Sequence, residues 1–251
     1  SSGQDTIFEN SDIRVSKVAG KGYGVLAARR FETGAVVLQE EPFARVNKNT
    51  KETAATNAGA AVLMKRVYEL AAKGTFDPQN DKSWPPEVVA CLDQVLDIQA
   101  EEVFGQLSES HQSTWMSLQY VSLKQPKSKE VDEFSKKSIS PGRLLRTNAF
   151  DDAQGFANLY SLTARFNHSC LPNTSRVAGD NHLVTIVAAR PILTGHELFI
   201  SYLDVAGSGP CGGLNVRERR EYLDKNYGFR CMCDLCRRQA APPQYMQRRE
   251  A

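Results

Sequence analysis

The hydrophobic pattern divides the chain into strand-like ends and a helical middle. From Ile13 to Val46, apolar and polar residues alternate, and the glycine-rich stretch GKGYG interrupts the alternation. A period of two is typical of strands that bury one face, so we predict short antiparallel strands here. Strand patterns return in HLVTIVAARPI and in HELFISYLD, which the turn LTG separates, and the amphipathic run NVRERREYLDKN follows.

The middle of the chain, residues 47–146, has the period of helices. Two sets of apolar residues recur at helical spacing: Leu63, Val67, Leu70 and Ala71, and then Val88, Leu92, Val95 and Leu96. Pro85 and Pro86 are well placed to open the second helix. The lysine-rich part SLKQPKSKEVDEFSKK has interleaved acids, so we expect a solvated face there. Strand-rich ends around a helical insert predict an α+β fold.

The composition is that of an ordinary globular protein and does not indicate a particular binding partner. The chain has 251 residues and a formal net charge of +2, which by itself does not indicate nucleic-acid binding. No apolar run is long enough for a membrane span, and the first residues lack a signal-peptide pattern. We therefore expect a monomer that binds neither membrane nor nucleic acid directly, in a reducing compartment such as the nucleus or the cytoplasm.

Three of the six cysteines lie together in CMCDLC. Cys231, Cys233 and Cys236 place three thiolates close enough for one metal ion, and a structural zinc site needs four ligands. The candidates for the fourth are Cys91, Cys170, Cys211 and the histidines. Cys91 lies on the apolar side of a predicted helix, where a small buried hydrophobe is the simpler reading. Cys211 is in a loop rich in glycine and fits a free thiol.

Cys170, in the segment RFNHSCLPN, completes the site only if the chain folds back on itself. This requires residues 231–236 to dock on residues 165–173. The sequence neighbours Arg230, Arg237 and Arg238 would then offset the negative charge of the thiolates. A nucleophilic Cys170 beside His168 ranks lower, because catalytic pairs are usually assembled by the fold and not by adjacency. Asn173 is expected to cap the turn after Pro172.

Five segments in order resemble the SET-domain lysine methyltransferases, and most closely their SMYD branch. The segments are GKGYG, TNAFDDAQGFANLYS, RFNHSCLPN, GHELFISYLD and YGFRCMCDLC, and the resemblance covers residues 12–46 and 143–238. It implies a SET-domain fold of short antiparallel strands with a pseudoknot, in which the segment after NHSC passes through a loop formed by a preceding segment. Such threading is rare among folds.

The resemblance also implies a division of the chain. The parts are an N-terminal part of the SET domain at 12–46, the helical insert at 47–146, the core SET domain at 147–204, a post-SET zinc-binding segment at 205–238 and a tail at 239–251. Residues 47–90 carry no metal-ligand cluster, so we expect the MYND module of the SMYD branch to be missing. We expect its helical C-terminal domain to be absent as well.

Residue by residue, the resemblance assigns three groups of positions. The positions expected to contact S-adenosylmethionine are Lys21, Gly22, Tyr23, Gly24, Asn148, Asn167, His168, Tyr202, Tyr227 and Phe229. The positions expected to line the channel of the target lysine and to act in catalysis are Phe150, Tyr160 and Tyr202, with Phe229 at its mouth. The expected zinc ligands are Cys170, Cys231, Cys233 and Cys236. Taken alone, each aromatic here also fits core packing.

The implied activity is methyl transfer from S-adenosylmethionine to a lysine of a histone or another protein. One departure is His196, which stands where the family has an acid. We expect this change to affect the surface, with an altered substrate groove as the alternative. Two other functions stay open: a catalytically silent SET-fold module that binds zinc and mediates interactions, and a methyltransferase with a non-protein acceptor.

Overall fold

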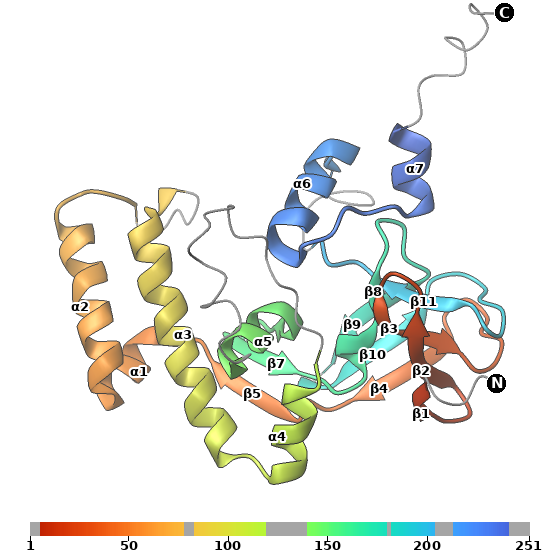
Figure 1. Cartoon of the computed structure of the whole chain (residues 1–251), viewed down its shortest axis with the longest axis horizontal. Coiled ribbons are helices and arrows are strands. Elements are labelled where there is room, and N and C mark those ends of the chain that lie inside the picture. The colour runs from red at the N-terminus through yellow and green to blue at the C-terminus, as the bar shows by residue number, and fades with distance from the viewer. Residues whose placement is uncertain (1–5, 78–82, 119–139, 180–181, 204–212, 241–251) are drawn as a thin grey trace, which may run out of the picture. The chain divides into compact units, whose positions relative to one another are not determined.

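The computed structural model describes residues 6–77, 83–118, 140–179, 182–203 and 213–240 (Figure 1). The chain forms two compact units. Of the described residues, unit 1 contains 6–41, 162–179, 182–203 and 213–240, and unit 2 contains 42–77, 83–118 and 140–161. This division differs from the one based on hydrophobic pattern, because strand pairing joins residues on both sides of the helices.

The larger sheet of unit 1 has five strands. In spatial order they are β1 (Thr6–Glu9), β2 (Ile13–Val18), β3 (Gly22–Ala27), β11 (Glu197–Ile200) and β8 (Asn167–His168). Each neighbouring pair from β1 to β11 is antiparallel. The last pair, β11 with β8, is parallel. The short antiparallel strands predicted from the alternation are thus confirmed, and the parallel pair is an addition that the pattern did not indicate.

A second sheet of unit 1 has three antiparallel strands. Its order is β4 (Val36–Glu40), β10 (Val184–Ala188) and β9 (Thr174–Ala178). Along β10, Val184, Ile186 and Ala188 are buried and the residues between them are partly exposed, which is the period of two seen in the sequence. Unit 1 also contains the 3₁₀ turn η2 (Thr163–Arg165) and the helices α6 (Val216–Tyr227) and α7 (Asp234–Ala240).

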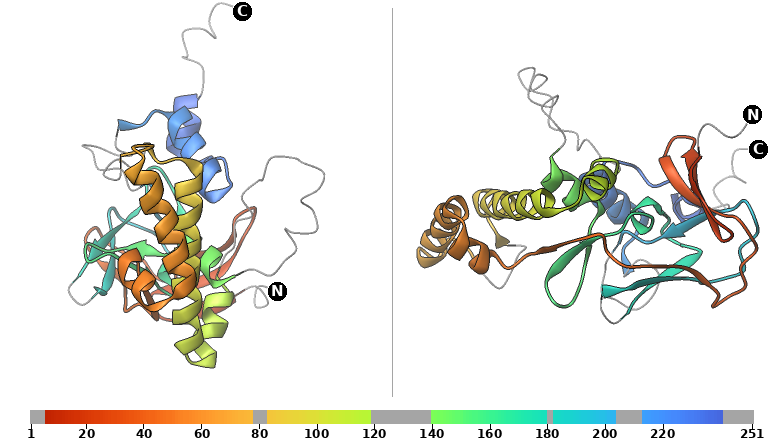
Figure 2. Two further views of the ribbon diagram at one scale, coloured as in Figure 1. Left: turned by 90° about the vertical axis from the view of Figure 1, so that its left-hand side faces the viewer. Right: turned by 90° about the horizontal axis from the view of Figure 1, so that it is seen from below.

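Unit 2 combines helices with a small sheet. The helices are α1 (Thr50–Thr56), α2 (Ala58–Ala72), α3 (Pro86–Gln106), α4 (Glu109–Met116) and α5 (Pro141–Asn148), and the sheet order is β5 (Ala44–Asn47), β7 (Phe156–Leu159) and β6 (Phe150–Asp151). Figures 1 and 2 show α2 and α3 side by side. As predicted, Pro86 opens α3, and Cys91 is buried between these helices with Met64 and Val95.

Two expectations from the sequence concern residues that the structure does not describe, and a third concerns membrane spans. The lysine-rich stretch lies within residues 119–139, which are outside the described residues, and so does Cys211. Among the helices that the structure describes, none combines the length and the apolar character needed to cross a bilayer.

Asn173 cross-links the loop after β8 to β11. Its side chain accepts a hydrogen bond from the backbone N–H of Phe199 at 2.8 Å and donates to the carbonyl oxygen of Glu197 at 2.9 Å. Thr174 adds a bond from its hydroxyl to the carbonyl oxygen of Phe199 at 2.7 Å. The side chain of Asn173 therefore does more than cap a local turn, because it fixes the loop against a distant strand.

Replacing Asn173 with alanine should destabilise unit 1. The change leaves a backbone donor and a backbone acceptor of β11 without partners, at a cost of about 1–3 kcal/mol for each buried group. Urea denaturation followed by circular dichroism measures the change in the free energy of unfolding. Asn226→Ala on the exposed side of α6 is the control, with an expected effect within about 0.5 kcal/mol. Equal stability losses in both variants would contradict this role of Asn173.

Candidate functional site

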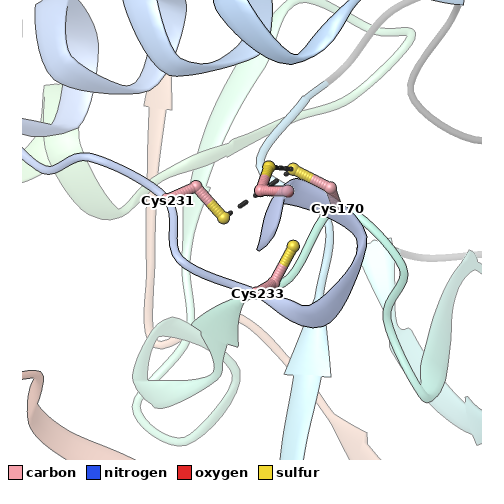
Figure 3. A group of neighbouring side chains, drawn as sticks. Cys170, Cys231 and Cys233 are labelled. Atoms are coloured by element: carbon pink, nitrogen blue, oxygen red, sulfur yellow. Dashed lines mark hydrogen bonds between the residues drawn. The ribbon is translucent and has the colours of Figure 1, made fainter. Parts of the chain in front are cut away.

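Four cysteine sulfurs gather in unit 1. The Sγ atoms of Cys170, Cys231, Cys233 and Cys236 all lie within 4.8 Å of one another. The sulfur of Cys170 is 3.5 Å from that of Cys236 and 3.8 Å from that of Cys231. Figure 3 shows the sulfurs of the three labelled cysteines turned toward one another. The predicted fold-back of the C-terminal cysteines onto Cys170 is therefore confirmed.

Local sequence explains how the C-terminal cysteines are presented. α6 begins with a capping box in which the Asn215 side chain accepts from the backbone N–H of Glu218, and the Glu218 carboxylate accepts from that of Asn215. The helix ends at Gly228, whose φ of +68° is the left-handed conformation that glycine adopts without steric cost. Cys231 and Cys233 follow before α7, and Cys236 lies in α7.

A buried arginine lies against the sulfurs. Arg219 is only 2% exposed, and its Nη2 donates to Sγ of Cys236 at 3.6 Å and to Oε1 of Gln239 at 2.6 Å. Its Nη1 donates to the carbonyl oxygen of Leu214 at 2.5 Å. A buried cation needs a negative partner, and a cluster of thiolates supplies one.

The arginines that flank the cysteines in sequence have different positions. Arg237 pairs with the carboxylate of Asp234 at 2.6 Å, and Arg238 donates to the carbonyl oxygen of the same residue at 3.3 Å. Arg230 is exposed to solvent. The cation in direct contact with the sulfurs is therefore Arg219, one of the residues on the buried side of α6, which adjacency in the sequence does not indicate.

Crowding shifts the pKa values of the sulfurs in opposite directions. The hydrogen bond with Cys231 and burial raise the pKa of Cys170. The hydrogen bond from Cys170 lowers the pKa of Cys231 to about 3, against the effect of burial and with help from the ring of His168. One thiolate thus forms readily, while its neighbour resists a second negative charge so close by. A divalent cation among the sulfurs would remove this penalty.

Tyr202, two residues after β11, lies within a group of aromatic rings. Its ring centroid is 4.8 Å from that of Tyr227, 5.3 Å from that of His168 and 6.4 Å from that of Phe229, with the last pair edge to face. Tyr227 ends α6 and Phe229 follows it. The segment that carries the C-terminal cysteines therefore packs its aromatic residues against Tyr202 and His168. The structure thus brings four of the predicted site residues together.

The hydroxyl of Tyr202 is fixed and neutral. It donates a hydrogen bond to the carbonyl oxygen of Phe166 at 2.6 Å. Burial, followed by the nearby Tyr227 and Glu197, raises the pKa of Tyr202 well above its usual range. At physiological pH this phenol is therefore neutral, and it acts as a dipole and not as a base.

The buried ring of His168 faces the cysteine cluster. Its Nε2 is 3.2 Å from Sγ of Cys170, and its Nδ1 accepts a hydrogen bond from the backbone N–H of Tyr202 at 2.9 Å. Both ring nitrogens are thus engaged within the protein. The cofactor contact predicted for His168, through its main chain or its ring, stays a prediction.

Asn167 occupies a tight corner between β8 and β3. Its Nδ2 donates to the carbonyl oxygen of Tyr23 at 3.2 Å and to Oε1 of Glu197 at 2.8 Å. A Cβ atom at Gly24 would lie 2.7 Å from this Nδ2 and 2.8 Å from the side chain of Val18. Glycine fits here because the side chains of Asn167, Val18 and Glu197 already occupy the place of a Cβ atom.

Glu197 connects this corner to the glycine-rich turn. Its Oε2 pairs with Nζ of Lys21 at 2.6 Å, and that ammonium also lies 4.5 Å from the ring centroid of Phe199. Gly22, at φ +77°, shapes the turn that carries Lys21. Glu197 was not among the predicted site residues. The sequence signal for Glu197 was a single acidic residue at the start of a buried strand. His196, the residue before it, is exposed to solvent.

Three predicted site residues belong to unit 2. Asn148 is buried at the end of α5, and its side chain donates to the carbonyl oxygen of Leu144 at 2.8 Å. The rings of Phe150 and Tyr160 meet edge to face with centroids 5.8 Å apart, and Tyr160 is buried. Their roles in cofactor binding and in the lysine channel stay predictions.

Comparison with known proteins gives one family and several relatives. The SET domain family matches residues 22–203. The SET domain-containing protein L678 of Acanthamoeba polyphaga mimivirus is 27% identical over 233 residues, which are 90% of this chain and 78% of that protein. The protein-lysine N-trimethyltransferase SMYD5 of Gallus gallus is 38% identical over 89 residues, or 35% of this chain and 20% of that protein.

A further relative is the histone-lysine N-methyltransferase SMYD3 of Homo sapiens, which is 40% identical over 81 residues, or 32% of this chain and 17% of that protein. The chain therefore spans only about a fifth of the length of these two vertebrate proteins. The family match, in contrast, runs from the first residue of β3 to Leu203. Because this match covers most of the chain and includes Asn167, Cys170 and Tyr202, the protein belongs to the SET-domain family.

Proposed function

We propose that this protein is a protein-lysine N-methyltransferase that uses S-adenosylmethionine. The observation that carries the proposal is the position of Tyr202, whose neutral hydroxyl is fixed by Phe166 within the aromatic group formed with Tyr227 and Phe229. Family membership supports methyl transfer, because SET methyltransferases use this donor. Lysine as the acceptor is supported by the names of the relatives SMYD3 and SMYD5.

The corner around Asn167 fits the methyl donor. A side chain at Gly24 would displace Asn167, so glycine at this position keeps Asn167 in place. The side-chain oxygen of Asn167 accepts no hydrogen bond from the residues that the structure describes, so it is available to a cationic ligand group. The ammonium group at the methionine end of S-adenosylmethionine is such a group. When bound, this cofactor supplies a methyl group on a positively charged sulfur.

The residues of the site serve position and electrostatics more than acid-base chemistry. Methyl transfer to an amine is an in-line displacement, which needs the reacting atoms aligned and water excluded. Because its proton is donated to Phe166, Tyr202 directs its lone pairs away from that carbonyl, and these orient the lysine amine. Tyr202 does not take the lysine proton, since burial keeps the phenol neutral.

The aromatic group also prepares the lysine for attack. The aliphatic part of a lysine side chain suits aromatic walls, and its charged head can lie against their faces. Burial beside a positively charged donor lowers the pKa of the amine, because both effects disfavour the ammonium form. Tyr202 and Phe229 are the aromatic residues of unit 1 that we propose for this role, while the assignment of Phe150 and Tyr160 to the lysine channel rests on the family resemblance alone.

We further propose that the four cysteines bind one Zn²⁺ ion. A tetrahedral site with Zn–S distances of about 2.3 Å has sulfurs about 3.8 Å apart, which agrees with the separations of 3.5 and 3.8 Å from Cys170. All four positions would be filled by thiolates, so the ion has a structural role. Together, the Zn²⁺ ion and its four thiolates would have a net charge of about −2, which the buried guanidinium of Arg219 would partly offset.

The proposed partner is a lysine-bearing protein, with histone tails as the first class to test because the name of SMYD3 states histone-lysine methylation. We propose that the protein acts as a monomer in the nucleus or the cytoplasm, without direct contact with nucleic acid or membrane.

Tyr202→Phe should abolish most of the methyl transfer. Loss of the hydroxyl removes the dipole that orients the amine, and we expect the rate to fall about 100-fold or more, with cofactor affinity changed less than about threefold. The assay is incubation with labelled S-adenosylmethionine, histones and cell extract. Tyr222→Phe, at an exposed position of α6, is the control.

Other outcomes of this assay point to other functions. Equal labelling by wild type and Tyr202→Phe would contradict the role of Tyr202. Cofactor binding without label in any fraction indicates a catalytically silent module, and label in small molecules alone indicates a non-protein acceptor.

Gly24→Ala should weaken cofactor binding. The added methyl group must displace Asn167 or Val18, since the space between them is already filled. We expect the affinity for S-adenosylhomocysteine, measured by calorimetry, to fall about tenfold. Gly105→Ala in α3, where nothing lies within 4 Å of the new atom, is the control and should leave the affinity unchanged. An unchanged affinity in Gly24→Ala refutes the assignment of this corner to the cofactor.

Cys170→Ser should lose zinc. Wild type should contain one zinc ion per chain, and the variant about tenfold less after dialysis against a chelator, because a hydroxyl is a poor replacement for a thiolate ligand. Zinc loss should also weaken S-adenosylhomocysteine binding, because Tyr227 and Phe229 are anchored by the same segment. Cys91→Ala is the control, and its zinc content should stay at the wild-type level. Undiminished zinc in Cys170→Ser would rule out Cys170 as a ligand.

A further inference from the structure

His168 contacts two parts of unit 1 with opposite sides of one ring. The side chain is only 8% exposed, so protein atoms surround the ring. Nε2 lies 3.2 Å from Sγ of Cys170, and Nδ1 lies 2.9 Å from the backbone nitrogen of Tyr202. The ring therefore spans the distance between the cysteine cluster and the residue proposed to orient the lysine amine.

The contact with Tyr202 determines which ring nitrogen carries the proton. A backbone N–H can only donate, so Nδ1 must accept and is without a proton. The proton of the neutral ring is then on Nε2, which faces Cys170. Nε2–H consequently donates to the sulfur. This bond is strongest when the sulfur is a thiolate, the form in which cysteine binds a metal ion.

The bond from Tyr202 acts where the chain leaves the sheet. Ile200, the last residue of β11, pairs with His168 in the parallel ladder. Two residues later, the N–H of Tyr202 is bonded to the His168 side chain instead of a strand. The rings of the two residues are also in contact. The direction in which Tyr202 departs from β11 is thus set by the side chain of His168.

We propose that His168 is a positioning residue that couples the metal site to Tyr202. A metal ion bound at the cluster fixes the sulfur of Cys170, which fixes the ring of His168, which in turn fixes the backbone of Tyr202 and the aromatic group around it. This inference rests on the zinc and methyl-donor binding proposed above. It goes beyond them, because it proposes that the side chain of His168 connects the cysteine cluster with Tyr202.

Two conservative substitutions separate the two halves of this link. In His168→Asn, the side-chain oxygen takes the place of Nδ1 and can accept from Tyr202, but the shorter side chain does not reach Cys170. In His168→Gln, the amide nitrogen takes the place of Nε2 and can donate to Cys170, but no acceptor remains at Nδ1. A residue that merely fills space would not show such a division.

The measurements are zinc release to a chelator, the backbone amide resonance of Tyr202 in ¹⁵N-labelled protein, and the affinity for S-adenosylhomocysteine. His168→Asn should release zinc about tenfold faster, as expected for loss of a bond to a metal ligand. Its Tyr202 resonance should stay the same when zinc is removed, whereas zinc removal should shift this resonance in wild type. His168→Gln should retain zinc, shift the Tyr202 resonance and bind S-adenosylhomocysteine about three- to tenfold more weakly. His196→Gln, at an exposed residue just before β11, is the matched control.

The opposite results overturn the coupling. If zinc removal shifts the Tyr202 resonance as much in both variants as in wild type, or shifts it in none of the three proteins, His168 does not couple the two sites. Should the variants fail to fold, long-range ¹⁵N–¹H spectra of the wild-type ring decide, since a proton on Nδ1 in the zinc-bound protein excludes the proposed link. Failure of the proposed enzymatic function is recognised separately, by the absence of labelled product while zinc release and the Tyr202 resonance behave as described.

Discussion

The parallel pairing of β8 with β11 is the constraint on which the site depends. It aligns Asn167 with Phe199 and His168 with Ile200, although these residues are far apart in the sequence. Parallel strands cannot be joined by a tight turn, and the intervening chain makes the hairpin of β9 and β10 in the other sheet before it returns. The side chain of Asn173 hydrogen-bonds the start of this intervening segment to β11. Asn167, His168 and Tyr202 become neighbours only through this pairing.

The cysteine cluster applies a second constraint to the same strands. Cys170 follows β8 by two residues, so closure of the cluster anchors the segment from α6 to α7 directly beside the parallel pair. The anchored segment contributes the aromatic rings around Tyr202 and the buried Arg219. A small set of sulfur contacts therefore decides both the local stability of this segment and the surroundings of the proposed catalytic tyrosine.

Much of this arrangement was predictable because its signals are local. Alternation of apolar residues indicated β2, β3, β10 and β11, and helical spacing indicated α2 and α3. The spacing of CMCDLC indicated a metal-binding cluster, and the need for a fourth thiolate indicated the fold-back onto Cys170. Three features were not predicted from the sequence: the carboxylate of Glu197 beside Asn167, the contact of Arg219 with the sulfurs, and the orientation of the His168 ring. Each depends on a partner at least 17 residues away in the sequence or on a side-chain direction.

The sequence by itself determined the kinds of elements, the residues able to bind a metal ion and the family resemblance, because these follow from the order and chemistry of neighbouring residues. Only the tertiary structure decided which polar groups meet. Asn167 and Gly24 meet because β3 and β8 both pair with β11, and His168 faces Cys170 and Tyr202 together because β8 runs parallel to β11. Such contacts depend on which strands pair and in which register, and no local pattern encodes that choice.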